Sequence, residues 1–201
     1  MSLALDLRHE PVSGINHGKL VMWIFLASEI MFFSGFFGAF IVLRNANIDI
    51  FTQSSAEHLN VALASLNTVF LISSSLTMAL SIYHLERNNK ALFQVFLGIT
   101  LLCAFGFLVV KYFEYSAKFH HHIYPRTNIF FAFYFLMTGF HGLHVVGGII
   151  PMAWMFVRSF TKKGYTNARR VEVLGLYWHF VDLVWIFLFP ALYLLFPTLH
   201  P

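Results

Sequence analysis

The sequence predicts an all-α fold: a polytopic membrane helix bundle with five transmembrane helices, its N-terminus inside and its C-terminus outside. Hydrophobic residues make up 58% of the 201-residue chain and charged residues only 11%, whereas a soluble domain carries about 25% charged residues. The chain contains five apolar segments, each with the roughly 20 residues that a membrane-spanning helix needs. Basic residues are divided unequally between the connections, which predicts the orientation.

The five apolar segments must form helices, because lipid offers no hydrogen-bond partners to an unpaired backbone. Membrane β-strands would appear as short segments of alternating hydrophobicity, and the sequence has none. The predicted spans cover about residues 20–43, 59–85, 91–115, 129–157 and 173–196. We expect one transmembrane domain, residues 18–201, after a cytoplasmic segment of residues 1–17, and we expect the polar stretch 45–58 to be a simple connection.

The distribution of basic residues predicts which helix ends face the cytoplasm. With the N-terminus inside, nine basic residues fall on inner segments and three fall on outer loops. The inner residues are Arg8, Lys19, Arg87, Lys90, Arg158, Lys162, Lys163, Arg169 and Arg170. The outer residues are Arg44, Lys118 and Arg126. Because these residues flank membrane spans, we expect them to contact water or lipid headgroups, and we expect no nucleic-acid partner.

Three acidic residues lie inside the predicted spans, where charged groups are costly and usually face protein or a water-filled cavity. Glu29 and Asp182 each lie about nine residues into a span, at a depth of roughly 14 Å. Glu114 follows Lys111 by three residues, which predicts a local ion pair on one helix face. Glu29 has no basic residue within one turn, so its carboxyl favours the neutral form and needs a hydrogen-bond partner from another helix. Both a proton-linked and a purely structural role are open for Glu29.

Two pairs of polar residues share the same spacing in the last two spans. His141 and His144 are three residues apart in the fourth span, and His179 and Asp182 are three residues apart in the fifth. A zinc site would need a third and usually a fourth ligand, and the single cysteine excludes a cysteine cage. We therefore predict no metal, and a buried polar seam that joins the first, fourth and fifth spans. The predicted members of the seam are Glu29, His141, His144, Glu172, His179 and Asp182.

Small residues and prolines predict local features of the helices. Pro151 and Pro190 are expected to kink the fourth and fifth spans. The run His120–His122 fits a metal-binding tract or, in the favoured interpretation, a solvated outer loop. Small residues that would let helices approach closely are Ser34, Gly35, Gly38, Ala39, Gly139, Gly142, Gly147 and Gly148.

Several motifs resemble, in order, those of the cytochrome c oxidase subunit III family of haem–copper oxidases. Residues 27–37 read ASEIMFFSGFF and resemble the glutamate-bearing helix of that family. Residues 138–145 read TGFHGLHV and match its HGLHV motif, and residues 177–185 read YWHFVDLVW and match its terminal helix. The resemblance covers about residues 18–196 and indicates a five-helix bacterial form without the first two helices of longer members. Further similarities lie at 66–68 and 73–75, from 98 through 115, and at Glu172.

The resemblance implies an accessory, non-catalytic subunit of a proton-pumping cytochrome c oxidase of the respiratory chain, located in the bacterial inner membrane. It implies that the chain carries no haem or copper, which belong to the catalytic subunit, and that it binds phospholipid and supports proton uptake. Its implied partners are oxidase subunit I, subunit II and other respiratory-complex subunits. Glu29 falls on the buried family glutamate, Phe25 and Arg158 fall near lipid-contacting positions, and Lys162 is expected to meet lipid phosphate with Arg158.

Other functions stay open at this point. The chain could be the third subunit of a quinol oxidase, or the companion of a nitric oxide reductase. A haem-binding membrane cytochrome would need His141 or His144 to face His179 across a haem. A small transporter or proton channel would need a continuous polar path, to which the second and third spans contribute little charge.

Overall fold

The structure, a computed structural model, describes residues 17–161 and 167–195, which are helical along most of their length. The elements are α1 (His17–Ala46), α2 (Ile48–His58), α3 (Val61–Glu86), α4 (Lys90–His120), α5 (Ile129–Ser159), α6 (Ala168–Phe189) and the π-helix η1 (Pro190–Leu194). Five helices are long and apolar enough to cross a membrane, the last one running from α6 into η1. The predicted all-α fold with five membrane-spanning helices is therefore confirmed.

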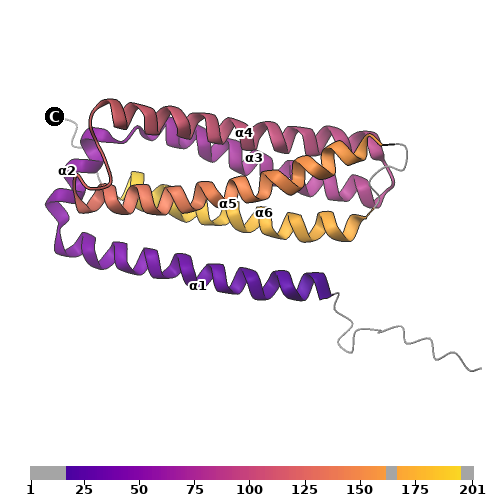
Figure 1. Cartoon of the computed structure of the whole chain (residues 1–201), viewed down its shortest axis with the longest axis horizontal. Helices are drawn as coiled ribbons and strands as arrows, with labels where there is room; N and C mark the ends of the chain where they lie inside the picture. The colour runs from indigo at the N-terminus through magenta and orange to yellow at the C-terminus, as the bar shows by residue number, and fades with distance from the viewer. Residues whose placement is uncertain (1–16, 162–166, 196–201) are drawn as a thin grey trace, which may run out of the picture.

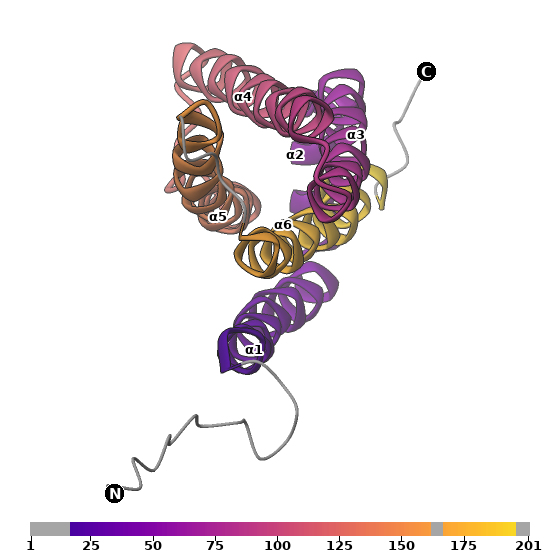
Figure 2. The same ribbon diagram turned by 90° about the vertical axis from the view of Figure 1, so that its right-hand side faces the viewer.

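The long helices lie side by side along the long axis of the molecule (Figure 1). Viewed end-on, α3, α4, α5 and α6 form a four-helix bundle in which sequence neighbours pack together and α3 also packs on α6 (Figure 2). Helix α1 stands outside this bundle, against α6 and α5. It begins at the end of the molecule where α6 begins (Figure 1). The membrane orientation stays a prediction: the distribution of basic residues indicates that the beginning of α1 faces the cytoplasm.

Four helices begin at an asparagine whose side chain accepts a hydrogen bond from the backbone three residues later. The distances from the side-chain oxygen to that nitrogen are 3.1 Å at Asn60, 3.2 Å at Asn89, 2.9 Å at Asn128 and 3.3 Å at Asn167. Each bond satisfies one of the backbone N–H groups that a helix start leaves without an intrahelical partner. These caps fix where α3, α4, α5 and α6 begin.

The prediction that residues 45–58 form a simple connection is wrong, because α2 occupies most of this segment. The ring of Phe51 is fully buried, with its centroid 5.4 Å from that of Phe40 and 5.5 Å from that of Phe130. The side-chain amide of Asn128 donates to the Ser54 hydroxyl at 2.8 Å. Helix α2 therefore closes one end of the molecule by packing against the start of α5.

The last span changes geometry at Pro190, as the sequence suggested for this proline. A proline has no backbone N–H and disrupts the hydrogen bonding of an α-helix. The α-helical pattern ends at Phe189, and the N–H of Leu195 bonds the Pro190 carbonyl at 3.0 Å in a π-helical turn. Pro151, in contrast, lies within α5, which continues as an α-helix to Ser159.

The small residues divide into two groups. A Cβ atom added at Gly148 would lie 2.8 Å from the Trp178 ring, and one at Gly147 would lie 3.2 Å from the Tyr177 hydroxyl, so close approach of α5 and α6 is confirmed there. At Gly35, Gly38 and Gly142 an added Cβ would meet nothing within 4 Å. The prediction of close approach is wrong at these three positions, because no atom of a neighbouring helix comes within contact distance of them.

This contrast predicts different outcomes for one substitution at two positions of α5. Gly148→Ala should lower the free energy of unfolding by about 1–3 kcal/mol, because the methyl group must displace the Trp178 ring. Gly142→Ala should leave stability unchanged or raise it by up to about 1 kcal/mol, since alanine favours helix more than glycine does. Unfolding followed by circular dichroism in detergent micelles measures both, and equal effects would contradict the close packing at Gly148.

Candidate functional site

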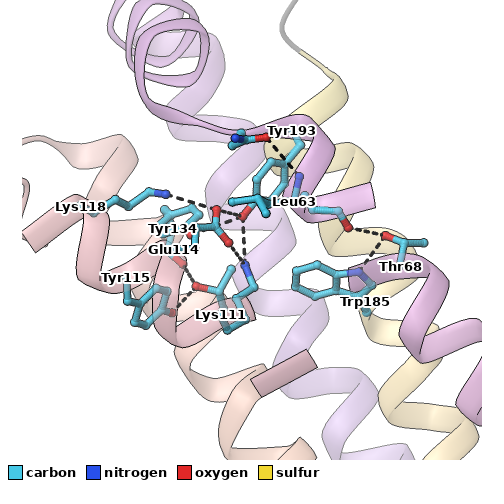
Figure 3. Close-up of polar contacts among 12 residues, drawn as sticks. Leu63, Thr68, Lys111, Glu114, Tyr115, Lys118, Tyr134, Trp185 and Tyr193 are labelled. Carbon is cyan, nitrogen blue, oxygen red and sulfur yellow. Dashed lines mark hydrogen bonds and ion pairs between the residues drawn. The ribbon is translucent and has the colours of Figure 1, made fainter. Parts of the chain in front are cut away.

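A buried charge cluster lies between α4, α5 and η1 (Figure 3). The Lys111 Nζ donates to Glu114 Oε2 at 2.9 Å and to the Tyr193 hydroxyl at 3.0 Å. The other carboxylate oxygen of Glu114 accepts from Tyr193 at 2.6 Å and from Lys118 Nζ at 3.2 Å. The Tyr134 hydroxyl lies 3.3 Å from that of Tyr193. The predicted ion pair of Lys111 and Glu114 is confirmed, and it belongs to a larger network.

The network follows from helix geometry and from aromatic neighbours. Lys111, Glu114 and Lys118 recur three and four residues apart, so they share the face of α4 that points into the bundle. Two ammonium groups face one carboxylate, which leaves a net positive charge. Aromatic faces attract such a charge: Lys111 Nζ lies 4.6 Å from the Trp185 ring centroid and Lys118 Nζ lies 4.6 Å from that of Tyr134. The expectation that Lys118 contacts water or lipid headgroups is wrong, because its side chain is buried in this network. The four-residue spacing from Glu114 to Lys118 was a usable signal for this contact, and Tyr193 was missed.

Glu29 finds its partner on another helix, as the sequence required. Its Oε2 lies 3.0 Å from Nε2 of His144, and this contact joins α1 to α5. The Nδ1 of His144 lies 2.8 Å from the Phe140 carbonyl, which can only accept, so Nδ1 carries hydrogen. One proton must then lie between Nε2 and the carboxyl group, either on Glu29 or on His144.

A second polar contact holds the beginning of α1 against α6. The Lys19 Nζ donates to Glu172 Oε1 at 2.5 Å, and this contact joins the first turn of α1 to the second turn of α6. Both side chains are about one-third exposed, and such pairs contribute little stability on their own. Between the two bridges, the Tyr177 hydroxyl donates to the His144 carbonyl at 2.8 Å. Helix α1 is therefore tied to α5 near its middle and to α6 near its start.

The remaining polar residues of the last two spans point elsewhere. The His179 Nδ1 lies 2.6 Å from the Ser75 hydroxyl of α3, and Ser75 is also a hydrogen-bond partner of Asp182. The His141 ring is fully buried, and neither of its nitrogens has a partner among the described residues. It packs between the rings of Phe107 and Trp185, with centroids 5.6 and 5.2 Å away.

The structure thus brings five of the six predicted seam residues into three separate contacts and leaves the sixth, His141, among aromatic rings. Glu29 meets His144, Glu172 meets Lys19, and His179 and Asp182 meet α3. Three residues advance a helix by about 300°, so side chains at that spacing differ by about 60° in direction. At the junction of α5 with α1 this difference sends His144 to α1 and His141 into the bundle.

The residues expected to contact lipid lie apart from this site. The Phe25 ring is partly exposed and its centroid lies 6.1 Å from that of Tyr177. The Arg158 guanidinium is exposed and lies 5.0 Å from the Trp154 ring centroid, at the end of α5. Lys162 lies outside the described residues. Lipid contact at these positions stays a prediction.

Histidine, cysteine and carboxylate side chains do not gather for metal binding in residues 17–161 and 167–195, where no group of three or more is placed to hold an ion. His144 and His179, two of the three candidate haem ligands, are instead hydrogen-bonded to Glu29 and Ser75. The geometry of these side chains is that of a brace between helices.

Comparison with known proteins gives a consistent result. The family described as cytochrome c oxidase subunit III matches residues 9–196. The cytochrome c oxidase subunit 3 of Bacillus subtilis is 35% identical over 180 residues, which cover 88% of this chain and 85% of that protein. The corresponding protein of Alkalihalophilus pseudofirmus is 33% identical over 183 residues, with the same coverage. A probable quinol oxidase subunit 3 of Staphylococcus saprophyticus is 28% identical over 181 residues, which cover 90% of each chain.

Proposed function

The chain belongs to the cytochrome c oxidase subunit III family, and from this premise we propose that it is the non-catalytic third subunit of a proton-pumping oxidase that takes electrons from cytochrome c. Family membership makes it a multi-pass bacterial membrane protein and a component of a haem–copper oxidase. Its proposed role is to pack on the catalytic subunit, to bind phospholipid, and to support proton uptake and the stability of the complex.

The observation that carries the proposal is the contact of Glu29 with His144. These residues belong to the two motifs that resemble the family most specifically, ASEIMFF and HGLHV. Their side chains bind each other across α1 and α5 at 3.0 Å. A pair that holds two helices together fits a bracing subunit, and we assign no catalytic residue to this chain.

Haem and copper are assigned to the catalytic subunit, subunit I. The directions of the histidines support this assignment. A haem held between His144 and His179 would require both to leave their present partners, Glu29 and Ser75. The remaining histidine in the middle of these spans, His141, is enclosed by Phe107 and Trp185.

We propose that α1 presents the face that docks on subunit I, with subunit II and other respiratory subunits completing the complex. Helix α1 is the least covered of the five spans. Large apolar side chains such as Val21, Met31 and Val42 are 66%, 74% and 67% exposed. Phospholipid would lie near Phe25 and at the phosphate-binding pair of Arg158 and Lys162, the contacts that the resemblance implies.

A second candidate function, that of a quinol oxidase subunit, differs from the first in the electron donor of the complex. Relatives named as quinol oxidase subunit 3 are 28–29% identical to the chain, whereas those named as cytochrome c oxidase subunit 3 are 31–35% identical. The purified complex should therefore oxidise reduced cytochrome c. Turnover with a quinol and none with reduced cytochrome c would establish the quinol oxidase alternative.

Deleting this subunit tests the proposed role itself. The oxidase purified from cells without the chain should begin to turn over and then lose activity sooner than the complete enzyme, because its proton supply and bracing are impaired. Oxygen consumption followed to inactivation measures that lifetime. An unchanged lifetime and an unchanged subunit composition would contradict the proposal.

Substitutions at Glu29 test the brace. Glu29→Ala should lower the free energy of unfolding by about 1–3 kcal/mol, since His144 loses its partner in a half-buried position. Glu29→Gln should retain most of the stability, because an amide N–H can donate to Nε2 as a protonated carboxyl does. Thermal unfolding and turnover lifetime of the intact oxidase measure both variants. Wild-type values of both quantities for Glu29→Ala would remove Glu29 from the account.

A further inference from the structure

We propose that the groove between α4 and α5 binds a phospholipid molecule, with one acyl chain along the groove and the phosphate at its end beside His120. This site is separate from the lipid contact proposed at Phe25, Arg158 and Lys162. Arg158 lies at the far end of α5 from the groove's His120 end. The proposal does not depend on the oxidase function.

The groove has the dimensions of a hydrocarbon chain. It has a volume of about 600 Å³ and follows α4 from Phe107 to His120, a rise of about 20 Å. The groove is therefore long and narrow, a shape that an extended acyl chain can fill.

The sequence creates the groove through two glycines opposite a row of aromatic residues. Gly139 and Gly142 form its floor on α5, and an added Cβ would lie 4.0 Å from the Tyr115 hydroxyl at the first and meet nothing within 4 Å at the second. The Tyr115 hydroxyl and Thr138 are hydrogen-bonded at 2.5 Å, so their polar groups are satisfied. On the side that faces away from the bundle, the contact between α4 and α5 is covered by no other described helix (Figure 2).

The charge at one end selects an anionic headgroup. Phe119 lines the groove beside His120, and its ring stacks on Tyr124 with centroids 5.8 Å apart. The guanidinium of Arg126 lies 5.9 Å from the centroid of that same Tyr124 ring. Residues 116–128 contain basic side chains and no acidic residue. The nearby carboxylate of Glu114 is already bound by two lysines, so a phosphate meets positive charge without a competing acid.

Counting phospholipids on the purified oxidase complex by native mass spectrometry tests the proposal. Gly142→Leu should remove a bound phospholipid, because Gly142 lines the groove and a Cβ there meets nothing within 4 Å, so the added side chain takes the space of the acyl chain. Ala79→Leu is the matched control, since Ala79 is also a small residue, is exposed on α3 and does not line the groove. Arg126→Gln should reduce occupancy by phosphatidylglycerol about fivefold, as expected for one basic residue near a headgroup.

The outcomes separate this proposal from the proposed function. An unchanged lipid count in Gly142→Leu, or an equal loss in Ala79→Leu, would overturn the α4–α5 site. Either result would leave the subunit assignment intact, because subunit composition and oxygen consumption are measured on the same preparation. Arg158→Gln should remove a different lipid, so the double variant with Gly142→Leu should lose both.

Discussion

Replacing Glu114 by glutamine is expected to lower the free energy of unfolding by about 3–5 kcal/mol, because removing one partner of a buried ion pair leaves the other charge uncompensated. Glu114 is 3% exposed and accepts hydrogen bonds from Lys111, Lys118 and Tyr193. An amide has no charge to offset the two ammonium groups. Chemical unfolding of the purified chain in detergent micelles measures the change.

Two controls give this prediction its specificity. Glu86→Gln makes the same chemical change at an exposed position at the end of α3, and it should alter stability by less than about 0.5 kcal/mol. Tyr193→Phe removes only the hydroxyl bonded to Glu114 and should cost about 1–3 kcal/mol. If Glu114→Gln proves as mild as Glu86→Gln, the charge cluster does not stabilise the fold as described.

Trp178→Ala is expected to lower the free energy of unfolding by about 3–5 kcal/mol, as the deletion of a large aromatic side chain from a packed core does. The Trp178 side chain is fully buried, its Nε1 donates to the Ser74 hydroxyl at 3.0 Å, and its ring covers Gly148. The deletion leaves a cavity between α3, α5 and α6 and removes a hydrogen bond. Chemical unfolding of the purified chain in detergent micelles measures the change in the free energy of unfolding.

The matched control for the tryptophan is Trp23→Ala on α1. Trp23 is 59% exposed, so in the isolated chain its removal should change stability by less than about 0.5 kcal/mol. Trp178→Phe should fall between the two, because the ring is partly kept while the Ser74 bond is lost. Equal costs for Trp178→Ala and Trp23→Ala would contradict the packing of α6 in the bundle.

The membrane spans could be predicted because the length of an apolar run and the needs of the backbone in lipid decide them locally. Helix α2 could not be predicted from its polarity, since it depends on Phe51 inserting between Phe40 and Phe130 from two other helices. The small residues of α1 show the same limit. Ser34 with Gly38, and Gly35 with Ala39, have the spacing of a packing motif, but the spacing does not say whether a helix lies opposite.

The contacts of the candidate site could be predicted from the sequence where both interacting residues lie on the same helix. The three-residue spacing of Lys111 and Glu114 was sufficient to predict their ion pair. The four-residue spacing from Glu114 to Lys118 would have been sufficient to predict the second ion pair. Tyr193 reaches Glu114 from 79 residues further along the chain, and only the tertiary fold shows this. The partner of Glu29 was expected on another helix, but choosing His144 over His141 requires the rotation of α5 relative to α1.

Purification through an affinity tag on this chain tests the central claim most directly. If the chain is a bracing subunit of a haem–copper oxidase, a haem-containing catalytic subunit should co-purify with it, and the preparation should consume oxygen. After the subunits are separated, the haem absorbance should stay with the partner. A chain that purifies alone, or that retains a Soret band after separation, would contradict the account.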